Sequence, residues 1–271
     1  MKQDTLPLPI PWSDISSKDV VFDLDGTLVE GDLGETVFYS CLLKDCINER
    51  WPVNSQQRSS DNMPGELEGT LYGTEAKIFK LYHSHLENNR FEEAYGLTAS
   101  FISEQADRAA VFTNSILARN TAPVDLHIKL ENGRSGPVYR LTYGARFIPE
   151  MKTLAAKIIR EGAAGWIVSA SPQAVCEIVG EQLGFDRSRV IGVHDHNGEM
   201  CTPWGRSKVT ALKERGVVEP VLAFGDSSGD RELLRFAQQG VLVWGCENRS
   251  LLSEAEKYGW FVLECPGKTT F

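Results

Sequence analysis

Short apolar runs alternate along most of the chain with segments whose apolar residues have helical spacing. The runs predict buried strands, and the segments between them predict amphipathic helices. Strands that alternate with helices are typical of a parallel α/β sheet, in which ligands bind beyond the carboxyl ends of the strands. In chain order, the predicted strands and helices of this sheet span 20–22, 149–159, 165–168, 172–183, 190–193, 207–214, 221–224, 231–236, 240–244, 251–258 and 261–263.

The chain between the first two of these strands has a different character. From about Glu30 to Tyr143 the apolar residues recur mostly with helical spacing, so we expect a helical insert that covers the ligand-binding edge of the sheet as a lid. Two domains follow: a core of residues 1–30 and 144–271, and a helical cap domain of residues 31–143. Within the insert, helices are predicted at 33–43, 76–85, 91–94 and 97–117, and a polar loop at 54–65.

Composition narrows the class of protein. The 271 residues are 42% hydrophobic with a net charge of −9, which is ample for a core and argues against a broad nucleic-acid surface. The six cysteines show no CxxC spacing and are expected to be reduced, and the HxH pairs at 83–85 and 194–196 lack a third ligand for zinc. We see no apolar leader or membrane-spanning segment, so we expect a cytoplasmic protein that binds no membrane.

Two carboxylates follow the first predicted strand. Asp23 and Asp25 lie two residues apart, so their side chains point the same way if the strand geometry continues, and Gly26 lets the backbone approach a ligand. Two like charges on one small patch are costly unless a cation neutralises them, and such an oxygen-lined site suits Mg²⁺. One carboxylate is able to attack as a nucleophile while the other passes a proton.

Hydroxyl groups follow the second strand of the sheet. A hydroxyl beside the free N–H groups of a helix N-terminus forms an anion site, and a helix is predicted to begin at Pro172. Either Ser169 or Ser171 is able to supply the hydroxyl. We expect Ser171 to cap the helix and Ser169 to donate to phosphate.

Charged residues complete the same sheet edge. Asp226 and Asp230 follow the strand at 221–224, and a glycine-rich turn ahead of a helix does not by itself require two acids at this spacing. Lys208 lies near a helix N-terminus, where the helix dipole disfavours it, so we expect it to have a carboxylate or phosphate partner. Arg206 competes for the same role.

These segments together resemble the signature motifs of the haloacid dehalogenase (HAD) superfamily. The matching residues are Asp-x-Asp-x-Thr at 23–27, the strand-terminal Ser169, Lys208, and Gly-Asp-x-x-x-Asp at 225–230. The resemblance implies a Rossmann-like α/β core with an inserted helical C1 cap. It also implies an Mg²⁺-dependent phosphatase that hydrolyses a small-metabolite phosphate monoester through an aspartyl-phosphate intermediate.

The resemblance also implies the roles of the residues. Asp23 is expected to be the nucleophile, and Asp25 the acid that protonates the leaving oxygen and then the base that activates water. Ser169 and Lys208 are expected to spread the phosphate charge. The Mg²⁺ ligands are expected to be Asp23, the backbone carbonyl of Asp25, and Asp226, with Asp230 binding through water or holding Lys208. Substrate contacts are expected from Thr27, Asp32, Ser171 and Arg206.

Within the superfamily, the chain resembles the phosphoserine-phosphatase-like branch, and there the phosphorylcholine-phosphatase-type members, over 20–32 and about 144–244. Asp32 lies nine residues after Asp23, where phosphoserine phosphatases carry a Glu that binds the substrate ammonium. The same Asp32 is suited to cap the helix at 33–43, and the two interpretations carry equal weight.

Other features bear on the substrate. Phosphoserine phosphatases carry Ser and Asn where this chain has Gly26 and Gly229, which weakens a phosphoserine assignment. A choline head group needs aromatic faces, although aromatic residues in amphipathic helices are more often core. Candidate aromatic residues in the insert are Phe38, Tyr39, Trp51, Tyr72 and Tyr82.

Two alternative activities remain within the same resemblance. A phosphotransferase would pass the phosphoryl group from Asp23 to an acceptor other than water. A haloacid dehalogenase would share the fold, but it needs no Mg²⁺ and lacks a second acid two residues after the nucleophile, so Asp25 argues against it.

Overall fold

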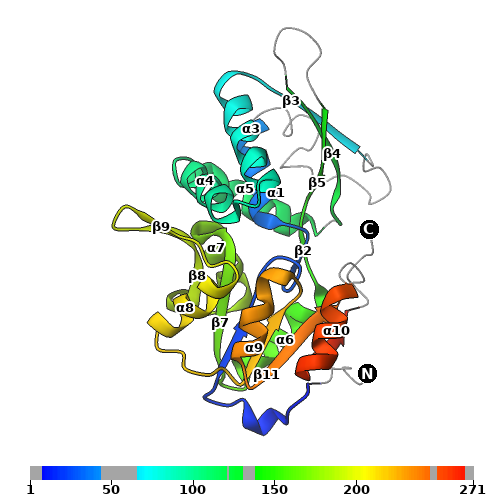
Figure 1. The fold of residues 1–271 in the computed structure, drawn as a ribbon, viewed down its shortest axis with the longest axis vertical. Helices are drawn as coiled ribbons and strands as arrows, with labels where there is room; N and C mark the ends of the chain where they lie inside the picture. The colour runs from blue at the N-terminus through cyan, green and yellow to red at the C-terminus, as the bar shows by residue number, and fades with distance from the viewer. Residues whose placement is uncertain (1–7, 44–65, 121, 131–137, 245–248, 266–271) are drawn as a thin grey trace.

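The computed structural model describes residues 8–43, 66–120, 122–130, 138–244 and 249–265. Figure 1 shows two parts stacked along the longest axis, a core that contains both described ends of the chain and an insert of residues 31–143 above it. The predicted loop at 54–65 and the candidate Trp51 lie outside the described residues. None of the described helices combines the length and apolar composition needed to cross a membrane.

The core confirms the predicted α/β class. Among the described residues, seven strands form one sheet in the order β12-β11-β10-β1-β7-β8-β9, with every pair parallel except β8 and β9. Helices cover both faces of the sheet, which explains why its central strands, unlike the exposed Glu199–Cys201, are apolar runs. The strands are β1 (Asp19–Phe22), β7 (Ala164–Pro172), β8 (Val190–His196), β9 (Glu199–Cys201), β10 (Leu222–Gly225), β11 (Gln239–Trp244) and β12 (Phe261–Glu264).

The core helices follow the predicted alternation within one or two residues at most ends. Proline opens the first of them, as its fixed φ favours, and a left-handed Gly184 closes the second. These helices are α6 (Pro149–Arg160), α7 (Gln173–Leu183), α8 (Arg206–Glu214), α9 (Arg231–Phe236) and α10 (Arg249–Tyr258), with short 3-10 turns η1 (Trp12–Asp14), η2 (Arg187–Arg189) and η3 (Ser228–Asp230).

Strand register brings three distant segments to one edge. Phe22 at the end of β1 is paired with Ile167 of β7 and Phe224 of β10. The Phe22 and Phe224 rings stack with centroids 4.6 Å apart, which fixes the two strands side by side. The residues that follow these positions therefore emerge together at the carboxyl edge of the sheet.

The insert is not helical throughout, which corrects the prediction. Its strands β3 (Glu66–Leu71), β4 (Val124–Leu130) and β5 (Val138–Tyr143) form a separate sheet, with β4 parallel to β3 and antiparallel to β5. Val124–Leu130 alternates apolar and polar residues, and its buried positions alternate accordingly. That period of two is the signal for a half-buried strand, and helical spacing in the neighbouring segments obscured it.

The helices of the insert pack against this sheet and over the core. They are α1 (Leu33–Leu43), α3 (Gly73–Glu87), α4 (Phe91–Ser103) and α5 (Ala106–Arg119). The first has the predicted bounds. The predicted break at residues 95–96 is wrong: α4 continues through Gly96, and the chain turns at residues 104–105 instead.

Two short strands join the insert to the core. β2 (Val29–Glu30) pairs antiparallel with β6 (Arg146–Phe147), and the chain leaves and re-enters the core through Gly31 and Gly144. Both glycines have positive φ, +84° and +110°. A Cβ on Gly31 would lie 2.5 Å from the carbonyl oxygen of Gly144, so this close crossing excludes a side chain.

Candidate active site

A cavity of about 460 Å³ lies where the carboxyl edge of the core sheet meets the insert. This is where ligands bind in open α/β sheets. Most of the predicted site residues line it. Its described lining residues include Asp23, Asp25, Asp32, Glu35, Tyr82, Tyr95, Ser169, Ser171, Trp204, Lys208 and Asp226.

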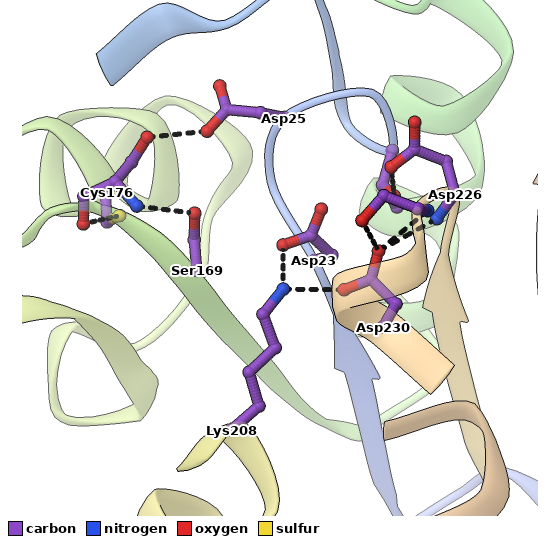
Figure 2. A network of polar contacts seen from close by, with 10 residues as sticks. Asp23, Asp25, Ser169, Cys176, Lys208, Asp226 and Asp230 are labelled. Carbon is purple, nitrogen blue, oxygen red and sulfur yellow. Dashed lines mark hydrogen bonds and ion pairs between the residues drawn. The ribbon is translucent and has the colours of Figure 1, made fainter. Parts of the chain in front are cut away.

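A buried cation joins two carboxylates at the floor of this cavity. Lys208 Nζ lies 2.5 Å from Asp23 Oδ1 and 2.6 Å from Asp230 Oδ1 (Figure 2). The three residues are 3%, 5% and 0% exposed, respectively. Burial lowers the pKa of Lys208, but the two carboxylates outweigh it and raise that pKa above its usual value. Lys208 is therefore the partner-bound lysine that the sequence predicts.

Asp230 holds the loop after β10 in place. Its Oδ2 accepts hydrogen bonds from the backbone N–H groups of Asp226 and Ser227 and from the Ser227 hydroxyl, at 3.2, 3.0 and 2.9 Å. The sequence left open whether Asp230 holds Lys208 or binds metal through water. The structure shows the contact with Lys208.

The carboxylates at this edge suit a metal ion. Each of Asp23, Asp226 and Asp230 offers an oxygen, and these oxygens lie within 4.8 Å of one another. Gly26, with φ +75°, makes room for the cluster, since a Cβ there would lie 1.9 Å from Asp226 Oδ2. Burial and the charge of Asp230 raise the pKa of Asp23, even though Lys208 opposes them. A bound cation would stabilise the charged form of Asp23 and of the acidic oxygens beside it.

Asp25 lies apart from this cluster and has its own partners. The Ser171 hydroxyl donates to its Oδ2 at 2.5 Å (Figure 2), and the Leu33 N–H donates to its Oδ1 at 2.7 Å. Burial, followed by the charge of Asp32, raises the pKa of Asp25 to about 7. A carboxyl group with a pKa near neutrality suits proton transfer in both directions.

Of the two serines near the end of β7, Ser171 differs from expectation. Ser171 does not cap α7 with its side chain, because its hydroxyl is bound to Asp25. The Ser169 oxygen accepts the Ser171 N–H at 3.0 Å, and both residues line the cavity. The demand of a half-buried carboxylate for a donor explains why the hydroxyl of Ser171 turns to Asp25 rather than to the helix.

Two further residues were predicted to contact the substrate, Thr27 and Arg206, and neither lines the cavity. Thr27 is buried behind the wall of the cavity, where its hydroxyl donates to Asp226 at 3.4 Å. Arg206 is exposed and does not line the cavity, so its side chain is not brought to the site. Lys208, two residues further along α8, makes the contact with Asp23 instead.

Asp32 caps α1 and lines the cavity at once. Its Oδ1 accepts the Glu35 N–H at 2.7 Å, so the capping interpretation is confirmed. Burial, followed by the charge of Glu35, raises the pKa of Asp32 to about 7. Glu35 accepts a short hydrogen bond from the Tyr82 hydroxyl, and burial raises its pKa too. Two acids of one helical turn thus face the same cavity.

The aromatic residues proposed for a choline head group differ in whether they reach the cavity. Phe38 and Tyr39 are fully buried and belong to the core of the insert, and Tyr72 is 56% exposed. Tyr82 is buried but reaches the cavity. The cavity residues that sequence reasoning did not identify include Glu35, Tyr95, Thr98 and Trp204. Tyr95 follows Phe91 by one turn of α4, and this spacing is the sequence signal that the two rings lie on one face of the helix.

Comparison with known proteins defines the class. The family model described as haloacid dehalogenase-like hydrolase matches residues 20–235. The chain therefore belongs to the haloacid dehalogenase-like hydrolase family. A search of curated proteins found no match.

Two solved structures share the fold at low sequence identity, and a third aligns with this chain at a lower score. A conserved protein of unknown function from Anaerococcus prevotii DSM 20548 is 13% identical, with a TM-score of 0.56 over 94% of this chain and 90% of that one. A protein of unknown function from Bordetella pertussis Tohama I is 14% identical, with a TM-score of 0.56 over 92% and 99%. A substrate-bound phosphoserine phosphatase is 14% identical, with a TM-score of 0.46 over 92% and 93%.

Proposed function

We propose that this hydrolase is an Mg²⁺-dependent phosphatase that cleaves the phosphate monoester of a small metabolite through an aspartyl-phosphate on Asp23. One observation carries the proposal: Asp23 is buried against Lys208 at the floor of a cavity, and Asp25, two residues on, faces that cavity with a separate set of partners. A nucleophile and a proton donor are thus held independently on one short loop. Family membership supplies the wider hydrolase class.

The side chains divide the reaction between them. Lys208 fixes Asp23 Oδ1, and the second oxygen points into the space between Asp25 and Asp226 (Figure 2). Attack of Asp23 on phosphorus breaks the bond to the leaving oxygen, which takes the proton of Asp25. Asp25 then removes a proton from the water that hydrolyses the aspartyl-phosphate. Ser169 and Lys208 face the phosphoryl oxygens, where fixed donors stabilise developing charge.

Asp23 and Asp226 would hold the metal ion, with Asp230 behind them. The backbone carbonyl of Asp25 is the third proposed ligand, since Asp230 contacts Lys208. When bound, Mg²⁺ would neutralise the repulsion between the phosphate and Asp23 and polarise the phosphoryl group.

We further propose that the chain divides into a catalytic core of residues 1–30 and 144–271 and a cap domain of residues 31–143. The paired glycines Gly31 and Gly144, both with positive φ, support a boundary at these two points. The separate sheet of the insert supports its treatment as a structural unit.

The charges of the cavity indicate the leaving group. Asp32 and Glu35 line the side away from the core floor, whereas Lys208 is the sole cationic side chain among the described lining residues and already contacts two acids. A leaving group with an ammonium and no carboxylate matches this pattern better than serine does. We therefore propose an amine-bearing alcohol phosphate as the substrate, recognised by Asp32.

A panel of phosphomonoesters with and without Mg²⁺ tests the function. Wild-type protein should release inorganic phosphate and the free alcohol, and Asp23→Asn protein that still unfolds in one cooperative melting transition should release neither. Transfer of the phosphoryl group to an added alcohol in preference to water would indicate a phosphotransferase. Halide release from a haloacid, with no phosphate release from any ester, would contradict the proposal.

A further inference from the structure

Trp204 stands at the contact between the core and the insert. It lies in the loop between β9 and α8, and its half-buried indole stacks on Phe91, the first residue of α4, with ring centroids 4.9 Å apart and planes 22° from parallel. Tyr95, one turn further along α4, lies nearly parallel to Phe91 at 6.5 Å. Trp204 and Tyr95 both line the cavity, so an aromatic wall faces the space above Asp23.

Gly229 makes room for this indole. A Cβ on Gly229 would lie 3.0 Å from Trp204 Nε1 and 3.4 Å from Trp204 Cδ1. The φ of Gly229 is not among the positive values of the chain, so its backbone would tolerate another residue. Space for Trp204, rather than backbone conformation, therefore accounts for the glycine in the Asp226–Asp230 loop.

Neighbouring contacts hold the Trp204 loop in place. The backbone N–H of Trp204 donates to Thr202 at 2.9 Å, and its carbonyl accepts from Ser207 at 3.1 Å. On the preceding hairpin, Met200 packs where Gly96 of α4 lacks a side chain, at 3.1 Å from a Cβ built there. Figure 1 shows this β8–β9 hairpin extending beside α4. The indole is thus supported from both the core and the insert.

We propose that Trp204 determines which leaving groups the cavity accepts, and that Gly229 is the residue that leaves it space to do so. The proposal rests on the phosphatase function proposed above. The indole forms a flat wall between the Asp226–Asp230 loop and α4, on the side from which a leaving group would extend. It favours a small cationic group that lies against an aromatic face and excludes a wide one.

Substrate preference tests whether Trp204 determines which leaving groups the cavity accepts. Trp204→Ala should lower kcat/KM for 2-aminoethyl phosphate about two- to tenfold, through KM, because the aromatic contact is lost. The same change should raise kcat/KM for the bulky 2-naphthyl phosphate, and Trp204→Phe should stay near wild type on both. Trp12→Ala, which removes an indole far from the cavity, is the matched control. An equal change on both substrates would overturn the proposal.

A double-mutant cycle tests whether Gly229 leaves space for Trp204, and it does not require turnover. Gly229→Asn should lower the melting temperature in the presence of Trp204, and most of that loss should disappear when Trp204→Ala is added. Gly229→Ala gives a milder version if the Asn variant does not fold. An equal loss with and without Trp204 would overturn the pairing. Absence of phosphate release by wild type from every ester would instead refute the phosphatase function and leave this cycle interpretable.

Discussion

Lys208 and Asp23 form a buried ion pair, with 2.5 Å between Nζ and Oδ1. Asp230 shares the same ammonium at 2.6 Å. A buried ion pair makes the stability of the fold depend on both partners, because removal of one partner leaves an uncompensated buried charge. The pair therefore ties the folding of the core to the groups proposed for catalysis.

Lys208→Met should accordingly lower the free energy of unfolding by about 3–5 kcal/mol. Urea unfolding at neutral pH in a divalent-free buffer measures it. Lys213→Met, on an exposed position of the same helix, should cost no more than about 1 kcal/mol, the value of the surface contact between its ammonium and the Phe236 ring. If the two variants are equally stable, the buried charges do not depend on Lys208.

Asp226→Asn should weaken the binding of Mg²⁺ to the active site. The amide keeps the shape of the side chain but removes one negative charge from the oxygen cluster, so the Mg²⁺ concentration for half-maximal rate should rise at least about tenfold. A titration of the rate with Mg²⁺ measures this value. The exposed Asp195→Asn is the control, and an unchanged titration for Asp226→Asn would remove it from the metal ligands.

The pH dependence of stability should report on Asp32. Its pKa is raised to about 7 in the folded protein. The protonated group favours folding, so its contribution is complete below about pH 4 and is lost as the pH rises through 7. Asn caps a helix as well as Asp but does not titrate. Asp32→Asn should therefore have a higher melting temperature than wild type at pH 8 and nearly the same one at pH 4.

Asp32→Ala separates the cap from the charge. Relative to Asp32→Asn, it should lower stability by about 1 kcal/mol at both pH values, because both variants lack the charge and only Ala loses the cap to Glu35. Melting curves of the three proteins at the two pH values measure both effects. If wild type and Asp32→Asn have the same melting temperature at pH 8, burial of the Asp32 charge costs the fold nothing.

Substrate recognition by Asp32 has a different readout. A charge-assisted contact with an ammonium is worth about 1.5–3 kcal/mol, so Asp32→Asn should lower kcat/KM for amine phosphates roughly ten- to a hundredfold. For a phosphate with a neutral leaving group the loss should be small. Equal losses on both substrates would contradict recognition of the ammonium by Asp32.

The core was predictable because its signals are local. Each core strand is a short apolar run, and its polar residues begin where the run ends, so Asp23, Ser169 and Asp226 could be assigned to one sheet edge before their register was known. The helix at Leu33–Leu43 was predictable for a similar reason, since Asp32 supplies a cap directly before it.

Features that depend on tertiary contacts were not predictable. The hydroxyl of Ser171 turns to Asp25, which is remote in the chain, and no pattern around Pro172 indicates that choice. Arg206 and Lys208 are equivalent as sequence, but only Lys208 faces the sheet. Trp204 reaches the cavity because a hairpin and Gly229 position it, which no local rule describes.

The identity of the nucleophile is the central claim, and trapping of the intermediate tests it most directly. With Asp25→Asn protein and an aryl phosphate, whose leaving group needs no proton, attack by Asp23 should proceed while hydrolysis of the aspartyl-phosphate is slowed. The account predicts a burst of about one phenol per protein molecule and the added mass of one phosphoryl group on the peptide that contains Asp23. Full steady turnover with no burst, or a phosphoryl group on a different residue, would contradict it.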